Sequence, residues 1–538
     1  MVGQGRKFWT VVTTLGFTLM LAACGGDGGT PSPAPPPGNS NTSPVASDDL
    51  AITQMNVPID INVLSNDVDS NGDKLQVGSV TQGSEGTVSI NPNGTIHYAP
   101  FANVTGRDSF TYTITDGKGG SATASVRVRM DFQDGQGIQR VSVSTNGTQG
   151  DHNSWMGASS SGGGFVAFLT FAGNLHPSGS NTGNILLHNR ATLTAELVTA
   201  DMNGLPTPGG QQPSVSSTGR YVAFSSGASN LVAGDTNGET DIFVRDMQQG
   251  ITTRVSIAST GAQGNGPSMA PSISGDGQYI AFWSLASNLV QNDLNGSGAD
   301  IFVYDSKTGI TSLVSIGPSG NQIGGGAFDR GPSISDDGRH VAFPSNGQIF
   351  VRDRQTNQTT MVSVSSAGVA ANSLCDLPVI SSNGQVVVFT STATNLVSGD
   401  SNGVRDIFAH DLQTGVTTRV SMATNGTEAN GEVPDLNKPA ISEDGRFVAF
   451  LSSATNLVAG DTNGVPDVFV RDHQTNQTVR INVDSNGNQA NGPSGDSVLV
   501  SMNANGQYVV FSSQATNLVS GDTNGWMDVF VAPNPLAP

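Results

Sequence analysis

Five acidic loops carry the residues of this chain whose types and spacing could do chemistry. Each loop reads Asp-x-Asn-Gly, and a second aspartate follows after two or three intervening residues. Oxygen-bearing side chains at alternate positions around a glycine can converge on a hard cation, so the pattern predicts weak calcium sites with a Kd of about 10⁻⁴ to 10⁻³ M. The predicted ligands are Asp235, Asn237, Asp241, Asp293, Asn295, Asp300, Asp400, Asn402, Asp406, Asp461, Asn463, Asp467, Asp522, Asn524 and Asp528.

A sixth acidic loop lies much earlier in the chain, where Asp67, Asp69, Asn71 and Asp73 alternate around a glycine. It also predicts calcium binding, although its twelfth position holds Gly78 instead of the glutamate of a strong site. For all six loops a purely structural alternative stays open, in which Asp and Asn form Asx turns and cap backbone amides. Calcium is the one cofactor that the sequence suggests.

The later loops belong to a repeat that runs through most of the chain. A strand phrase ending in phenylalanine recurs 46 to 61 residues apart, at Phe168, Phe224, Phe282, Phe343, Phe389, Phe450 and Phe511. Further phrases such as Asp241–Asp246 and 253–256 follow in most units. Together, these phrases predict four strands per unit. The fourth unit omits the acidic loop and turns directly through residues 345–348, so the loops are additions to the unit.

The two ends of the repeat predict a closed ring. The last unit stops after residues 528–531 without its fourth strand, whereas a matching phrase at 140–144 precedes the first unit. A strand from there that completes the last unit would leave no open array with exposed edges. The phrases at 271–274 and Asp467–Asp472 resemble the WD40-like (PD40) repeats of TolB-type propellers. We therefore expect a seven-bladed TolB-like β-propeller over residues 138–533.

Residues 44–130 form a separate region of short alternating strands, such as 59–64 and 109–114. Their landmarks, Asp48-Asp49 and the segments 62–67 and 106–112, resemble bacterial cadherin-like or Ig-like domains. That resemblance implies a β-sandwich used as a spacer or adhesive module. The expected fold class is all-β: a small Ig/cadherin-like β-sandwich, a linker at 131–137, and a seven-bladed β-propeller closed by an N-terminal strand.

The N-terminus predicts export and a lipid anchor. Arg6 and Lys7 precede an apolar stretch that is too short to span a bilayer but is typical of a signal peptide. It ends in Leu-Ala-Ala-Cys24, which resembles the bacterial lipobox and implies lipidation of Cys24 after removal of the leader at 1–24. Residues 25–43, rich in Gly, Pro and Ser, predict a flexible tether. We expect attachment to the cell envelope, in the outer membrane on its periplasmic or surface face.

Composition narrows the function without naming a ligand. The 538 residues carry a formal net charge of −20, which disfavours nucleic acid as a partner. The seven histidines have no metal-ligand spacing, and neither a G-x-S-x-G nor an H-E-x-x-H motif is present. The sequence favours a non-catalytic, envelope-anchored scaffold that binds a protein or carbohydrate. Two alternatives stay open: an extracytoplasmic hydrolase or lyase that acts on polysaccharide or peptide in the propeller channel, and a TolB-like periplasmic assembly factor.

Overall fold

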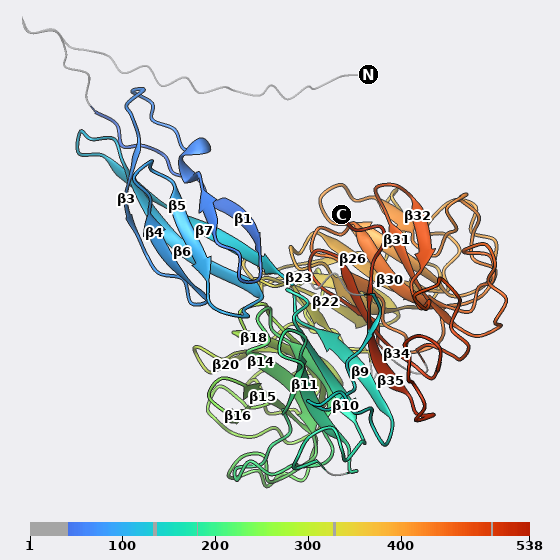
Figure 1. Cartoon of the computed structure of the whole chain (residues 1–538). Helices are drawn as coiled ribbons and strands as arrows, with labels where there is room; N and C mark the ends of the chain where they lie inside the picture. The colour runs from blue at the N-terminus through green and yellow to red at the C-terminus, as the bar shows by residue number, and fades with distance from the viewer. Residues whose placement is uncertain (1–40, 133–136, 180, 327–329, 496–498) are drawn as a thin grey trace, which may run out of the picture.

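A computed structural model of the chain describes residues 41–132, 137–179, 181–326, 330–495 and 499–538 (Figure 1). Their regular secondary structure is β-strand apart from one short 3-10 helix, η1 (Val63–Ser65), which confirms the all-β class. No helix in this part of the chain is long and apolar enough to cross a membrane. The predicted leader, Cys24 and most of the predicted tether lie outside the described residues.

The N-terminal strands form two sheets that share one core. The first sheet has the order β1 (Asp49–Gln54), β7 (Ser121–Asp131), β6 (Gly106–Thr115) and β3 (Gln76–Val80), and the second has β2 (Ile59–Ile61), β5 (Ile96–Pro100) and β4 (Gly86–Ile90). Strand β6 alternates buried and more exposed residues along most of its length, as a strand with one face on a core must. Tyr98, Tyr112 and Val126 lie fully buried in that core.

Seven further four-stranded antiparallel sheets follow, which we number 1 to 7 in chain order. Sheet 1 contains β9 (Ser154–Ser159), β10 (Phe165–Thr170), β11 (Asn184–Asn189) and β12 (Thr194–Leu197), and sheet 2 contains β13 (Gln211–Val215), β14 (Tyr221–Ser226), β15 (Asp241–Asp246) and β16 (Ile251–Arg254). Sheet 3 contains β17 (Ser268–Ile273), β18 (Tyr279–Ser284), β19 (Asp300–Asp305) and β20 (Ile310–Leu313), and sheet 4 contains β21 (Ser333–Ile334), β22 (His340–Ser345), β23 (Gln348–Asp353) and β24 (Gln358–Met361). Sheet 5 contains β25 (Cys375–Ile380), β26 (Val386–Ser391), β27 (Asp406–Asp411) and β28 (Thr417–Arg419), and sheet 6 contains β29 (Ala440–Ile441), β30 (Phe447–Ser452), β31 (Asp467–Asp472) and β32 (Gln477–Arg480). Sheet 7 contains β33 (Ser501–Met502), β34 (Tyr508–Ser513), β35 (Asp528–Pro533) and β8 (Gln139–Arg140).

The repeated phenylalanines are the core of each sheet and of its contact with the next. In sheet 2, Phe224 of β14 pairs with Phe243 of β15 and their rings stack with centroids 5.8 Å apart. Both rings are fully buried, since the two middle strands of each sheet are covered on both faces by neighbouring sheets. The same stacked pair recurs in sheets 3 to 7, whereas in sheet 1 Phe168 faces Leu186.

The N-terminal strand does complete the last sheet. Strand β8 pairs with β35, with Arg140 opposite Phe530, and fills the fourth position that the C-terminal segment leaves empty. Sheet 7 also shares a hydrophobic cluster with sheet 1, in which Val510 and Val531 pack with Val166 and Phe168. In Figure 1 the red strands β34 and β35 accordingly lie beside the teal strands β9 and β10.

The turns between the first and second strands of the sheets are linked to one another, and we call the side where they gather the turn face. The backbone hydrogen bonds run from Ser217 N to Gly275 O, Gly275 N to Asp336 O, Asp336 N to Ser382 O, Asn383 N to Glu443 O, Glu443 N to Ala504 O and Ala504 N to Ser161 O. The hydroxyl oxygens of Ser217 and Ser161 then lie 3.1 Å apart, which links sheet 2 to sheet 1. The series of hydrogen bonds passes through all seven sheets and returns to the first.

Candidate functional site

Asp336 lies where the seven turns meet. Its carboxylate Oδ2 accepts hydrogen bonds from the Ser217 hydroxyl of sheet 2 at 3.3 Å and the Ser161 hydroxyl of sheet 1 at 3.4 Å, although Asp336 itself belongs to sheet 4. Burial raises the pKa of this carboxyl, while Arg107 opposes the shift. A carboxylate in such a place needs a cation beside it, because an unpaired buried charge is strongly unfavourable.

Arg107, from β6 of the N-terminal domain, supplies that cation. Its Nε lies 3.2 Å from Asp336 Oδ2, and its Nη2 lies 2.5 Å from Glu443 Oε1 in sheet 6. Arg129 of β7 adds a second contact, from Nη1 to Glu443 Oε2 at 3.2 Å. The N-terminal domain therefore presents two guanidinium groups to two carboxylates at the centre of the turn face.

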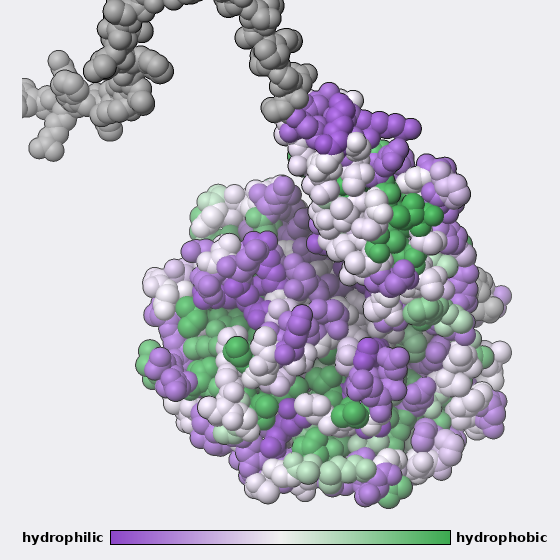
Figure 2. All heavy atoms as spheres, turned by 90° about the vertical axis from the view of Figure 1, so that its left-hand side faces the viewer, coloured by the Kyte–Doolittle hydropathy of each residue, from purple (hydrophilic) through white to green (hydrophobic). Residues whose placement is uncertain are grey.

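Backbone contacts hold the N-terminal domain on the same spot. A Cβ atom at Gly106 would lie 2.1 Å from the Ser217 carbonyl oxygen, and one at Gly162 would lie 2.2 Å from Gly106 N. Gly106 also has a φ of +106°, which L side chains rarely adopt. Phe132 N donates to Gly162 O at 2.9 Å, which fixes the segment that leaves the domain. Glycine is thus required on both sides of this junction, and the domain meets the turn face by one end (Figures 1 and 2).

The acidic loops lie at the opposite ends of the same strands, on what we call the loop face. In each sheet that carries one, the loop joins the second strand to the third, and its last aspartate begins the third strand, as Asp241 begins β15. Sheet 4 has a tight hairpin at this position, with Ser345 paired to Gln348, as the sequence predicts. Because neighbouring strands are antiparallel, a turn before the second strand and a loop after it lie at opposite ends.

Four of the five loops surround an arginine of the fourth strand. In sheet 2, Arg254 Nη1 lies 2.9 Å from Asp235 Oδ1 and 3.4 Å from Asp241 Oδ2. The equivalent groups are Arg419 with Asp400 and Asp406, Arg480 with Asp461 and Asp467, and Arg140 with Asp522 and Asp528. Here the guanidinium provides the positive charge that the sequence analysis assigned to calcium. The repeated phrase at 253–256, Thr-Arg-Val-Ser, predicts a strand, but its position in the sequence does not indicate that its arginine meets the loop.

The asparagine side chain of each of these four loops bonds to the last aspartate of the loop. Asn237 Nδ2 donates to Asp241 Oδ2 at 2.9 Å, and its Oδ1 accepts from the Glu239 backbone amide at 3.1 Å, which is an Asx turn. Asn402, Asn463 and Asn524 repeat this arrangement. Burial raises the pKa of Asp235, and the neighbouring Asp241 carboxylate raises it further.

The loop of sheet 3 has no arginine between its carboxylates. Leu313 stands opposite Phe302, where Arg254 stands opposite Phe243 in sheet 2. Instead, Gln322 Nε2 lies 2.9 Å from each of three oxygens, on Asp293, Asn295 and Asp300. The other oxygen of Asp293, Oδ2, is buried without a hydrogen-bond partner. This loop gathers two carboxylates around a neutral amide, so its charge is uncompensated at close range.

The N-terminal acidic loop combines an Asx turn with two free carboxylate oxygens. Asp69 Oδ1 accepts from the backbone amides of Asn71 and Asp73, and Asp73 Oδ1 lies 2.6 Å from Lys118 Nζ. Asp67 is bonded elsewhere, to the Tyr112 hydroxyl. The Oδ2 atoms of Asp69 and Asp73 are buried without a hydrogen-bond partner. Within the described ranges, no three His, Cys, Asp or Glu side chains form a group that could hold a metal ion.

A second set of charged residues lies on or just before the first strands of sheets 4 to 6, and no repeated pattern in the sequence marks it. Lys438, just before β29 in sheet 6, reaches past sheet 5 and donates from Nζ to Pro332 O in sheet 4 at 3.3 Å. Burial lowers the pKa of Lys438 to about 8. Arg330 of sheet 4 forms an ion pair with Asp376 of sheet 5.

Comparison with known proteins identifies the N-terminal part. Residues 41–129 match the family model for a bacterial Ig domain, which agrees with the expected Ig-like sandwich. No curated protein matches the chain. Three solved structures that resemble it are an oligogalacturonate lyase in complex with manganese (11% identity, TM-score 0.44, 86% of this chain and 99% of that chain), TolB from Agrobacterium tumefaciens (14%, 0.33, 66% and 98%) and a puromycin-hydrolyzing peptidase of Mycobacterium tuberculosis (12%, 0.43, 72% and 55%). These similarities are distant.

Proposed function

We propose that the seven sheets form a seven-bladed β-propeller closed by β8, and that the protein is a non-catalytic binding scaffold anchored to the cell envelope. The observation that carries this proposal is the contact of Arg107 with Asp336 and Glu443. This contact fixes the Ig-like domain over the centre of the turn face. With the domain attached there, the loop face is the one free to meet a partner.

Exposed apolar side chains on the loop face support the same assignment. Leu294 is 82% exposed and Trp526 is 39% exposed, and both stand in acidic loops. The Trp526 ring stacks on His152 with centroids 4.4 Å apart, which holds it in a fixed orientation. A fixed, accessible aromatic ring beside carboxylates suits a sugar or a basic protein segment, because both offer apolar surface together with hydrogen-bond donors.

Glycan and peptide arrays probed with the full-length mature protein test this function. We expect binding that Trp526→Ala and Leu294→Ser each weaken by about tenfold, since the removed contact area is worth on the order of 1.4 kcal/mol. Leu50→Ser, at a leucine of the Ig-like domain that is 67% exposed, is the control and should bind as the wild type does. Binding that only the control variant weakens would contradict the assignment of the loop face.

The envelope anchor is a proposal of its own. The lipobox cysteine and the match to a bacterial Ig domain support an exported protein with a lipid on Cys24. We expect the wild type to incorporate a fatty-acid probe and to fractionate with outer membranes, whereas Cys24→Ser should do neither. Protease treatment of whole cells then distinguishes the surface face from the periplasmic face. A wild-type chain without label would disprove the anchor.

We also propose calcium as a stabilising ligand of two loops, those of sheet 3 and of the Ig-like domain. Both have buried carboxylate oxygens without a hydrogen-bond partner, at Asp293, Asp69 and Asp73. In the other four loops an arginine lies within 3.4 Å of both carboxylates, so a calcium ion there would have to displace it. Calcium therefore suits the loop of sheet 3 best, whereas in the Ig-like loop it would compete with Lys118, which lies 2.6 Å from Asp73 Oδ1.

One observation favours the alternative of an extracytoplasmic hydrolase or lyase. Lys438 is an amine whose pKa burial lowers to about 8, so part of it is unprotonated near pH 8 and could act as a general base. A turnover screen against polysaccharides and peptides tests this candidate. Activity that Lys438→Met lowers at least a hundredfold without a change in Tm would replace the scaffold as the function.

A further inference from the structure

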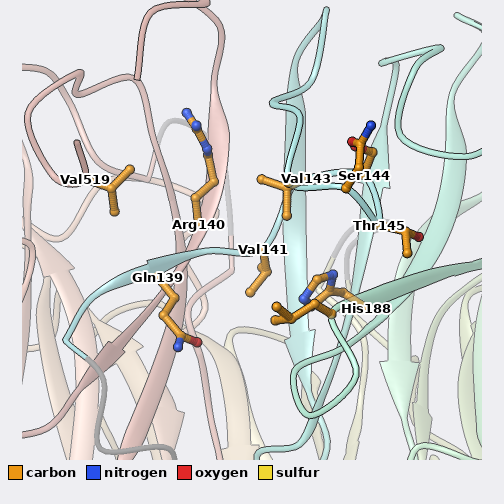
Figure 3. Close-up of a pocket in the computed structure, with 11 residues that line it drawn as sticks. Gln139, Arg140, Val141, Val143, Ser144, Thr145, His188 and Val519 are labelled. Atoms are coloured by element: carbon orange, nitrogen blue, oxygen red, sulfur yellow. The ribbon is translucent and has the colours of Figure 1, made fainter. Parts of the chain in front are cut away.

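A pocket of about 500 Å³ lies between sheet 7 and sheet 1, near their outer strands. Residues 139–147, which form and follow β8, make one wall, while His188 and Leu193 of the β11–β12 hairpin make the other. Figure 3 shows Arg140, Val141 and Val143 along the first wall, with His188 on the strand beside them. The volume falls within the range of small-molecule sites in proteins.

His188 lines this pocket as a buried polar group without a partner. Its side chain is 1% exposed, and its Nδ1 atom has no hydrogen bond in the described structure. An unpaired buried nitrogen costs about 1–3 kcal/mol, so a native fold seldom retains one without a reason. Burial, together with the nearby Arg190, lowers the pKa of His188 to about 4. The ring is therefore neutral at pH 7 and offers one nitrogen as acceptor and one as donor.

Sheet 5 contains the same histidine with its partner in place. His410 occupies the position of His188, and its Nδ1 lies 2.9 Å from Thr417 Oγ1 on the neighbouring strand. The Thr417 hydroxyl also donates to Val364 O in the loop that arrives from sheet 4. In sheet 1 the residue opposite His188 is Ala195. The missing hydroxyl removes both the partner of the histidine and a contact between adjacent sheets.

The same threonine contact closes other junctions between adjacent sheets. Thr311 donates to Ile257 O, and Thr478 donates to Met422 O at 2.6 Å. At the junction of sheets 7 and 1, Val143 corresponds to Ile257 and Met422, because each of the three begins an isolated β-bridge in the loop that enters the next sheet. Val143 also lines the pocket. The pocket thus lies at a junction without the threonine contact that joins sheets 2 and 3, sheets 4 and 5, and sheets 5 and 6.

We propose that this pocket binds an uncharged small molecule with an apolar body and a hydroxyl group, and that the hydroxyl pairs with His188 as the Thr417 hydroxyl pairs with His410. Val141, Val143, Leu193 and Val519 provide the apolar walls. An ionised ligand fits less well, because the charge of Arg140 is already paired with Asp522 and Asp528. This site adjoins the loop face at sheet 7, because Val519 belongs to the acidic loop there, but it does not depend on the scaffold function.

Benzyl alcohol and toluene are suitable probes, since they differ mainly in the hydroxyl group. Histidine-ring NMR spectra of the full-length mature protein would be recorded during titration with each probe. We expect benzyl alcohol to shift the His188 signal and to leave the His410 signal unchanged. The expected Kd is on the order of 1 mM, because a ligand with few non-hydrogen atoms gains little binding free energy. Toluene should bind at least fivefold more weakly.

Ala195→Thr is the matched variant, because it restores the residue that sheet 5 has at this position. It should abolish the shift of His188 by benzyl alcohol and raise Tm. Val519→Phe, which fills the pocket from the opposite side, replaces it if Ala195→Thr does not fold. The proposal is overturned if benzyl alcohol does not bind the wild type, binds it no better than toluene does, or binds the filled variants equally well.

Discussion

The Arg107 guanidinium lies 2.5 Å from the Glu443 carboxylate, and together with Arg129 it joins the Ig-like domain to sheet 6. The same arginine contacts Asp336 of sheet 4, and both carboxylates stand in turns that meet at the centre of the turn face. The Ig-like domain, expected as a spacer or an adhesive module, is therefore fixed to the turns of sheets 4 and 6.

Removal of the Arg107 charge should loosen this attachment. Arg107→Met keeps most of the side-chain length but leaves buried Asp336 without its cation, which we expect to destabilise the protein by about 3 kcal/mol. Urea unfolding measures the loss, and limited proteolysis between residues 132 and 138 should become faster. Arg127→Met, at an exposed arginine of the same domain, is the control and should change neither. Equal stability of both variants would refute the role of Arg107.

The arginine of the acidic loops and a bound calcium ion should be exchangeable. Leu313→Arg gives sheet 3 the residue of the other four loops, so it should remove the calcium response of that loop. In the wild type, calcium at ten times its Kd should add about 1.4 kcal/mol of stability, or 1–2 °C in Tm. Calorimetry with calcium and with chelator measures the difference. If Leu313→Arg and the wild type respond equally to calcium, the calcium response arises from another loop.

The reverse exchange provides an independent check. Arg254→Leu gives sheet 2 the residue of sheet 3 and leaves Asp235 and Asp241 unpaired, which should cost about 3–5 kcal/mol. Millimolar calcium should restore part of this loss, because a divalent ion can replace the guanidinium between the carboxylates. A variant as stable as the wild type in chelator would mean that the arginine contributes no stability.

Buried histidine should make the fold sensitive to acid. Burial lowers the pKa of His473 to about 4, whereas an unfolded histidine titrates near 6.5. The unfolded chain therefore takes up the proton first, and stability is lost as the pH falls from about 6.5 to about 4. His473→Leu, which introduces the residue of sheet 5 at this position, should lose about 2 kcal/mol less between pH 7 and pH 5. Urea unfolding at the two pH values tests this, and identical losses would contradict it.

Thiol reactivity reports on both cysteines at once. Burial raises the pKa of Cys375 to about 11, and its sulfur donates to the Ser391 hydroxyl at 3.2 Å. We expect no reaction of the native protein with a thiol reagent at pH 8, because the thiolate is the reactive form. After denaturation, one thiol per chain should titrate if Cys24 carries a lipid, and two in a cytoplasmic form that retains the leader. A fast reaction in the native state would contradict the burial of Cys375.

Local sequence patterns determined the secondary structure and the number of sheets. The phenylalanine phrases predicted seven units because each one is a buried strand with its own turn, and such patterns are complete within a few residues. The displaced strand was likewise predictable, since a missing phrase at one end and a spare one at the other need no coordinates, although the phrase lies at 140–144 and β8 covers Gln139–Arg140. The acidic loops were found in the sequence, but their partners were not.

Only the tertiary structure decided what the charged groups meet. Arg254 reaches Asp241 through the pairing of the third and fourth strands, and Arg107 meets Glu443 across a domain boundary, so neither contact leaves a spacing in the sequence. Arginine in four loops and leucine in the fifth then separates two kinds of acidic loop that read almost alike. The sequence specifies each strand and turn locally, whereas charge pairing depends on which strands and domains the fold brings within a few ångströms.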